Sequence, residues 1–168
     1  MLVIADASPL HYLILLESTD ILPVLFGRIV IPRAVAEELQ HRQTPAVVRV
    51  WMATPPAWLS IQHVSTASEG NLAHLDPREQ EVIRLAQALH ADLVLMDEWE
   101  GRREAVRRAL TVTSVLGVLE RAAQQELLDL PSTLTRLLAS NFYAPANLIR
   151  DMLARDARRK SRPPPDRR

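Results

Sequence analysis

Four carboxylates stand where the sequence predicts the ends of strands and the first turns of helices. Asp6 and Asp97 directly follow two apolar runs, while Glu38 and Glu79 fall within helical patterns. In parallel α/β sheets, ligands bind beyond the carboxyl ends of the strands, so the four side chains converge if the two runs are neighbouring strands. Mg²⁺ and Mn²⁺ prefer oxygen ligands, and clustered carboxylates repel one another unless a cation neutralises them. The pattern therefore predicts a site for Mg²⁺ or Mn²⁺.

Each of these carboxylates also has a purely structural explanation. Asp6 and Asp97 are suited to cap helices, and Glu79 occupies the third helical position of a capping box that Asp76 opens. Glu38 is by default a solvent-facing helix residue. The sequence leaves both readings open for each residue, and only the joint pattern favours the metal. A bound divalent cation would lower the pKa of water and stabilise the leaving oxygen of a phosphodiester.

Other kinds of active site are excluded or disfavoured by composition. The chain has no cysteine, which removes disulfides, thiolate nucleophiles and cysteine-bound metal centres. Its four glycines form neither a dinucleotide fingerprint nor a phosphate-binding loop. Lys160 is the sole lysine, the five histidines form no i, i+4 pair, and Ser8 and Ser114 lack the glycines of a nucleophile elbow. Carboxylates remain as the groups with chemistry to offer.

Short apolar runs alternate with helical patterns along the chain. Strands are predicted at 2–5, 28–31, 59–64, 93–96 and, more briefly, 110–113. Helices are predicted from Pro9 and at 32–39, 77–89, 97–110, 114–125, 131–139 and 145–158. This alternation is typical of an α/β fold, a three-layer sandwich with a mostly parallel central sheet, here with extra C-terminal helices.

Size and charge predict one domain with a basic end. The 168 residues, 48% of them hydrophobic, suffice for one compact domain over 1–156, followed by a proline-rich, disordered tail over 157–168. The net charge is zero, yet residues 150–168 hold eight basic and three acidic residues. A neutral total argues against non-specific coating of nucleic acid, while the tail is still able to contact phosphates. With no leader and no membrane span visible, a cytoplasmic protein is expected.

The segments around the carboxylates resemble the PIN-domain family, and within it the VapC-like branch of toxin ribonucleases with an Asp-x-Ser-Pro motif. The matching segments are VIADASPL at 3–10, IPRAVAEEL at 31–39, REQEVIRLA at 78–86, LMDEWEGRR at 95–103 and TSVLGVL at 113–119. The likeness runs to about residue 153, and the order and spacing of the segments carry it more than any one of them.

Carried over by position, the resemblance implies a catalytic and metal-binding set of Asp6, Glu38, Glu79 and Asp97. It implies substrate-contacting or supporting roles for Ser8, Glu81, Glu98 and Arg102, and Glu37 is a second choice to Glu38. Arg78 stands where the family has a glycine. As a neighbouring cation, Arg78 is able to pair with Glu79 and to compete with the metal, which leaves Glu79 less secure as a ligand.

In function, the resemblance implies a metal-dependent endoribonuclease that acts on RNA as a toxin. Such toxins are held inactive by an antitoxin protein and form homodimers. Trp99, beside two of the acids, is placed either to stack on a base or to pack against the protein. The alternative function is a catalytically silent module that keeps the fold and its capping carboxylates and acts through protein contacts.

Overall fold

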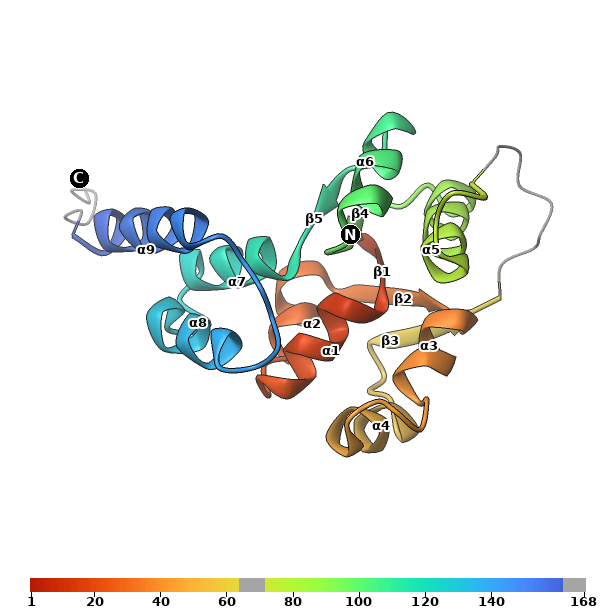
Figure 1. Cartoon of the computed structure of the whole chain (residues 1–168), viewed down its shortest axis with the longest axis horizontal. Helices are drawn as coiled ribbons and strands as arrows, with labels where there is room; N and C mark the ends of the chain where they lie inside the picture. The colour runs from red at the N-terminus through yellow and green to blue at the C-terminus, as the bar shows by residue number, and fades with distance from the viewer. Residues whose placement is uncertain (64–71, 162–168) are drawn as a thin grey trace, which may run out of the picture. The chain divides into compact units, whose positions relative to one another are not determined.

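The computed structural model describes residues 1–63 and 72–161 (Figure 1). The chain divides into two compact units, Met1–Val115 and Leu116–Arg168. Within the described ranges, no helix is long and apolar enough to cross a membrane. The carboxylates of interest all belong to the first unit.

The first unit is built on a five-stranded sheet whose described strands all run parallel. The strands are β1 (Leu2–Ala5), β2 (Arg28–Pro32), β3 (Leu59–Gln62), β4 (Leu93–Leu95) and β5 (Val112–Thr113), in the order β3-β2-β1-β4-β5. At the centre, Ile4 lies opposite Val30 on β2 and Val94 on β4. The predicted α/β class with a central parallel sheet is confirmed.

The sheet forms here because its central strands are apolar along most of their length, with the exposed Arg28 at the start of β2 as an exception. Val3, Ile4 and Ala5 have no exposed surface, and the middle of β2 and of β4 is equally buried. Strands covered on both faces show continuous rather than alternating hydrophobicity. The sequence pattern thus reports that helices cover both faces.

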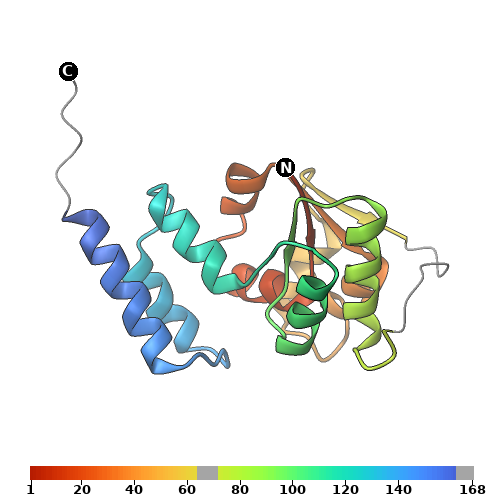
Figure 2. The ribbon, with the colours of Figure 1, turned by 90° about the horizontal axis from the view of Figure 1, so that it is seen from above.

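In the described part of the first unit, six helices surround the sheet. They are α1 (Ala7–Leu15), α2 (Ile21–Phe26), α3 (Arg33–Leu39), α4 (Ala46–Ala53), α5 (Pro77–Ala88) and α6 (Trp99–Arg107). Parallel strands are joined almost invariably by right-handed connections. Because the chain moves from β1 toward β3 and then crosses to β4 and β5, such connections place α1 to α4 on one face and α5 and α6 on the other (Figure 2). This arrangement gives the three layers.

A place for a ligand arises where the chain reverses the direction in which it adds strands across the sheet. After β3 the chain returns past β1, so β1 and β4 are neighbours whose connections leave in opposite directions. At such a switch point the loops diverge and open a crevice beyond the carboxyl ends of the strands. Asp6 and Asp97 follow these two strands.

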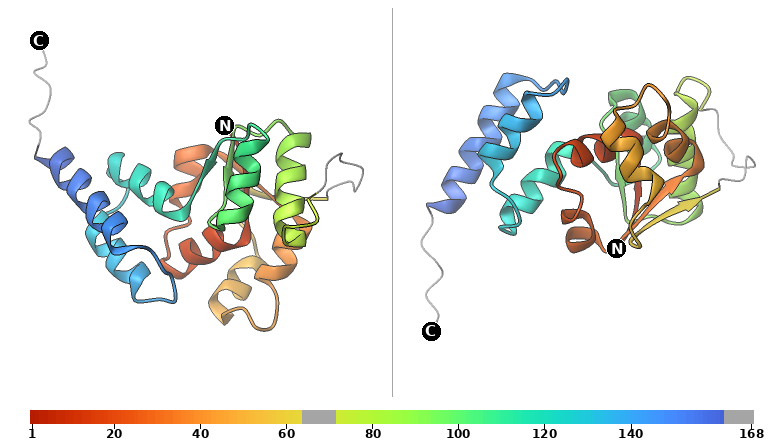
Figure 3. Two further views of the ribbon diagram at one scale, coloured as in Figure 1. Left: turned by 45° about the horizontal axis from the view of Figure 1, so that its top comes forward. Right: turned by 90° about the horizontal axis from the view of Figure 1, so that it is seen from below.

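The second unit is helical in its described part. It contains α7 (Val115–Gln124, which begins at the last residue of the first unit), α8 (Leu130–Leu138) and α9 (Ala146–Lys160), with α8 and α9 side by side (Figure 3). The predicted domain boundary at residue 156 falls inside α9. Lys160 there pairs with Asp129 at 3.2 Å and with Asp156 at 2.9 Å. Residues 162–168 of the predicted tail lie outside the described residues, and the domain division stays a prediction.

Several element bounds differ from those predicted. Helices α2 and α4 had no predicted counterpart, β3 ends at Gln62, and Val64 lies outside the described residues. The fifth strand begins at Val112 rather than at residue 110, and α6 ends at Arg107 because the chain then turns through Ala109, whose φ is 60°.

Candidate active site

Asp6 is a buried carboxylate between β1 and α1. Its backbone N–H donates to the carbonyl oxygen of Leu95 at 2.9 Å, which extends the pairing of β1 with β4 by one residue. Its Oδ1 accepts from the N–H of Ala7 at 2.8 Å, so the side chain caps α1. Only 7% of the residue is exposed, and burial raises its pKa to about 7, against the opposing effect of the Ala7 hydrogen bond. Near pH 7, Asp6 is therefore present in both its protonated and its ionised form.

The start of α5 places Glu79 beside Asp6. Asp76 caps this helix in a reciprocal capping box: the N–H of Asp76 donates to Oε2 of Glu79 at 3.0 Å. The other carboxylate oxygen, Oε1, is buried and has no hydrogen-bond partner. Burial also raises the pKa of Glu79. An unpartnered buried carboxylate oxygen is costly in a protein, and a bound cation is one way to satisfy it.

Gly101 on α6 allows this close packing against Glu79. A Cβ added at Gly101 would lie 2.8 Å from Oε1 of Glu79 and 2.5 Å from the sulfur of Met96. Any side chain at this position would therefore push the Glu79 carboxylate aside. Glycine at this position lets the ends of the Glu79 and Met96 side chains lie close against α6.

Asp97 follows β4 and accepts hydrogen bonds from Ser8 on α1 and from Val115, the last residue of the first unit. Its Oδ2 accepts from the hydroxyl of Ser8 at 3.0 Å, and its Oδ1 accepts from the N–H of Val115 at 2.8 Å. Burial raises the pKa of Asp97, while these two hydrogen bonds and the charge of Arg102 oppose the rise. The expectation that Asp97 caps the helix that follows it is wrong, because its side chain instead holds the first N–H of α7.

Arg78 joins α5 to α3 across the mouth of the site. Its Nη1 forms an ion pair with Oε1 of Glu38, and its Nε donates to Oδ1 of Asp76 at 2.7 Å. The ion pairs of Arg78 are thus with Glu38 and Asp76 rather than with Glu79. Glu79 is instead occupied by the backbone of Asp76 through its Oε2.

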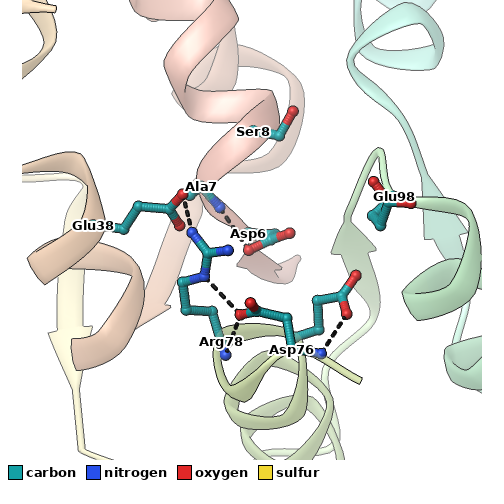
Figure 4. A pocket seen from close by; sticks show the side chains of 8 residues that line it. Asp6, Ala7, Ser8, Glu38, Asp76, Arg78 and Glu98 are labelled. Atoms are coloured by element: carbon teal, nitrogen blue, oxygen red, sulfur yellow. Dashed lines mark hydrogen bonds and ion pairs between the residues drawn. The ribbon is translucent and has the colours of Figure 1, made fainter. Parts of the chain in front are cut away.

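These residues line one open pocket of about 300 Å³ (Figure 4). Its lining comprises five carboxylates, one guanidinium and the small residues Ala7 and Ser8; the carboxylates are Asp6, Glu38, Asp76, Glu79 and Glu98, and the guanidinium is that of Arg78. Five acids against one cation give the pocket a strongly negative character when all are ionised. Such a pocket attracts cations.

The donor chemistry of the pocket fits a hard divalent cation. Its ligating atoms are carboxylate oxygens, and Glu79 Oε1 is buried without a partner. As the side chains stand, no three acidic or histidine side chains in residues 1–63 and 72–161 are close enough together to hold one ion. Arg78 accounts for part of this separation, since its guanidinium lies between Glu38 on one side and Asp6 and Asp76 on the other (Figure 4).

Some of the residues singled out from the sequence line the pocket, and others lie outside it. Asp6, Glu38, Glu79, Glu98 and Ser8 line the pocket together, and Asp97 is linked to it through the Ser8 hydroxyl.

Two further glutamates are engaged elsewhere. Glu37 pairs with Arg33 at 2.8 Å on the exposed side of α3, and Glu81 accepts from the N–H of Ala34 at 3.3 Å. Glu81 thereby ties α5 to the start of α3 and does not line the pocket. Trp99 is 69% exposed beside Glu98, so its side chain is not packed in the core.

Asp76 lines the pocket in addition to the helix-capping role that the sequence predicts for it. Asp76 was identified as a helix cap, and it does cap α5, but it also lines the pocket and binds Arg78. The signal that locates it is the capping box itself. A helix that starts at the carboxyl edge of a sheet places its cap residue in the ligand crevice.

Comparisons with known proteins agree with the fold. The family model DUF3368, described as a PIN domain, matches residues 2–157. Among solved structures, the chain is similar to a PilT N-terminus domain protein from the hyperthermophilic archaeon Sulfolobus solfataricus P2. That match has a TM-score of 0.52 and 14% sequence identity, and covers 86% of this chain and 100% of the other. At this identity the likeness concerns the fold alone. No curated protein gives a significant match.

Proposed function

The chain belongs to the PIN-domain family, whose members are generally nucleases, and on that premise we propose that it is a divalent-metal-dependent endoribonuclease. The observation that carries the proposal is the pocket at the switch point, lined by five carboxylates, with Oε1 of the buried Glu79 lacking a partner. This donor set suits Mg²⁺ or Mn²⁺. The proposed substrate is RNA.

The proposed metal ligands are Asp6, Glu38, Glu79 and Asp97. A divalent cation bound there would supply a nucleophilic water and stabilise charge on the leaving oxygen. The protein's own residues prepare this site. Burial excludes water from the carboxylates of Asp6 and Glu79, which strengthens their electrostatic attraction for a cation. The hydroxyl of Ser8 donates to Asp97 and fixes the orientation of that carboxylate.

Residues around the ligands are proposed to receive the RNA. Glu98 lines the pocket and is available as a further acid, while the charge of Arg102 acts on Asp97 from α6. The exposed Trp99 at the start of α6 presents an aromatic face on which an unpaired base can stack. These positions suit a single-stranded or looped RNA more than a duplex, because only unpaired bases are free to stack.

The cellular role proposed is that of a toxin of the VapC-like branch, restrained by an antitoxin protein and working as a cytoplasmic homodimer. This part rests on the resemblance of the five sequence segments. Co-expression with the product of an adjacent small gene would test it, since growth arrest without that product and growth with it is the expected result.

The enzymatic proposal is tested by cleavage of a fluorescently labelled single-stranded RNA with Mg²⁺ or Mn²⁺ and with excess EDTA. The chain offers a matched pair of variants, because Glu38 lines the pocket while its neighbour Glu37 pairs with Arg33 outside it. Glu38→Gln should lower cleavage at least about tenfold, and Glu37→Gln should leave it unchanged.

Two results would contradict the proposal. Cleavage undiminished by EDTA would show that no metal takes part. A folded protein that neither binds Mn²⁺ nor cleaves RNA would instead favour the catalytically silent binding module.

A further inference from the structure

The single guanidinium among the described pocket residues engages two of the pocket's own acids. Arg78 pairs through Nη1 with Glu38 on α3 and through Nε with Asp76 on its own helix. Figure 4 shows this guanidinium between Glu38 and the carboxylates of Asp6 and Asp76. A cation fixed in this position neutralises acids that would otherwise repel one another.

The ion pair between Arg78 and Glu38 is exposed enough for Glu38 to exchange Arg78 for another cation. The side chains of Arg78 and Glu38 are 37% and 35% exposed, so water and salt reach both partners. Ion pairs of this exposure bias an equilibrium only modestly. The contact of Arg78 with Asp76 lies within one helical turn and does not depend on Glu38. Glu38 can therefore change partner while Arg78 remains attached to the start of α5.

The neighbouring acids show that the pocket is not satisfied by Arg78 alone. Glu79 has a buried Oε1 without a hydrogen-bond partner. The charges of Glu38 and Glu79 add to the burial that raises the pKa of Asp6. A second cation in the pocket would relieve these repulsions, and Glu38 is the acid that Arg78 withholds from it.

We propose that Arg78 competes with the divalent cation for Glu38 and so sets the metal affinity of the site. The proposal rests on the proposed function, because it assumes that the pocket binds a divalent cation. When that cation binds Glu38, Arg78 is displaced from it and keeps its contact with Asp76. The affinity for metal is then lower than the five carboxylates would give without this arginine.

The test is a calorimetric titration of the metal-free full chain with Mn²⁺, without RNA. Arg78→Gln removes the charge and should tighten the Kd for Mn²⁺ about fivefold, the factor by which an exposed ion pair biases an equilibrium. Arg33→Gln is the matched control: Arg33 is also an arginine paired with an α3 glutamate, but its partner is Glu37, outside the pocket. The control should change the Kd by less than about twofold.

A double variant separates competition for Glu38 from a general effect of charge. Glu38→Gln should weaken Mn²⁺ binding because it removes a proposed ligand, but by less in the parent than in the Arg78→Gln background, because in the parent the cation must first displace Arg78 from this acid. In the Arg78→Gln background, Glu38→Gln should abolish the gain. If the gain persists without Glu38, Arg78 acts only through long-range charge and the proposal is wrong.

Further outcomes distinguish this proposal from the proposed function. A parent that binds Mn²⁺ and cleaves RNA, with an Arg78→Gln variant of unchanged or weaker affinity, overturns the competition and leaves the nuclease standing. If neither folded protein binds Mn²⁺, both proposals fall. Should Arg78→Gln fail to fold by circular dichroism, Arg78→Met serves instead. It keeps an unbranched side chain but not the charge, and an affinity no tighter than that of the parent would overturn the proposal.

Discussion

Replacing Asp6 with asparagine should make the metal-free protein's stability less dependent on pH. Asparagine caps a helix about as well as aspartate, so the hydrogen bond to Ala7 is retained in the variant. What is lost is a buried ionisable group, 7% exposed and close to Glu38 and Glu79. The change therefore isolates the cost of burying this charge.

The size of the effect follows from the pKa of Asp6. Burial raises it from 3.8 to about 7 in the folded protein, so the folded state binds a proton in a pH range where the unfolded state does not. Stability then falls as pH rises from about 4 to about 7. Between about pH 5 and about pH 8.5 the parent should lose about 3 kcal/mol through this group alone.

Urea denaturation in EDTA at these two pH values measures the difference. The parent should be the less stable protein at the higher pH, and Asp6→Asn should remove most of the fall. Adding Mn²⁺ at the higher pH should stabilise the parent more than the variant, because the cation neutralises the buried carboxylate. Parallel pH profiles for the two proteins would refute the reasoning, since Asp6 would then be ionised at little cost.

Three further changes test the packing around the pocket and the end of the chain. Asp97→Ala should lower the free energy of unfolding by about 2 kcal/mol, as measured by urea denaturation, because both of its hydrogen bonds are lost. Asp97→Asn keeps one acceptor oxygen for the N–H of Val115 and presents its amide NH₂ to the Ser8 hydroxyl, whose oxygen can accept, so it should lose less stability than Asp97→Ala while Mn²⁺ titration shows weaker metal binding. Gly101→Ala should cost about 1–3 kcal/mol in the same denaturation assay because its Cβ would meet Glu79. Truncation after Ser161 should leave the melting temperature unchanged. Truncation after Arg158 should lower it, because it removes Arg159 and Lys160, which pair with the buried Asp156. Equal melting temperatures for the two truncated proteins would contradict this.

Much of the fold is predictable because its signals are local. β1 has the predicted bounds because four apolar residues end at an aspartate and a Ser-Pro pair, which begin a helix. The capping box at Asp76 likewise marks the start of α5 from sequence alone. Signals of this kind depend on residues three or four apart, and tertiary packing does not override them here.

The two unpredicted helices lack such signals. α2 has six residues, includes Pro23 and has no side-chain hydrogen bond at its N-terminus. α4 follows Pro45, again without a side-chain cap, and its sequence is rich in valine, which favours strands. Both helices are stabilised by burial against the rest of the first unit: Leu22 and Val48 have no exposed surface. This tertiary contribution is not visible in a local pattern.

The site too combines residues that local signals locate with a contact that only the fold creates. Asp6 and Glu79 are locatable from strand ends and caps, whereas the pairing of Arg78 with Glu38 joins residues 40 positions apart and needs the fold. Arg78 and Glu79 do not pair with each other, because adjacent helix residues point about 100° apart and do not face each other. Arg78 at the second position of α5 is turned toward α3, and Glu79 at the third is turned back to its cap. Arg78 is therefore paired with the half-buried Glu38, and Oε1 of the buried Glu79 is left without a hydrogen-bond partner.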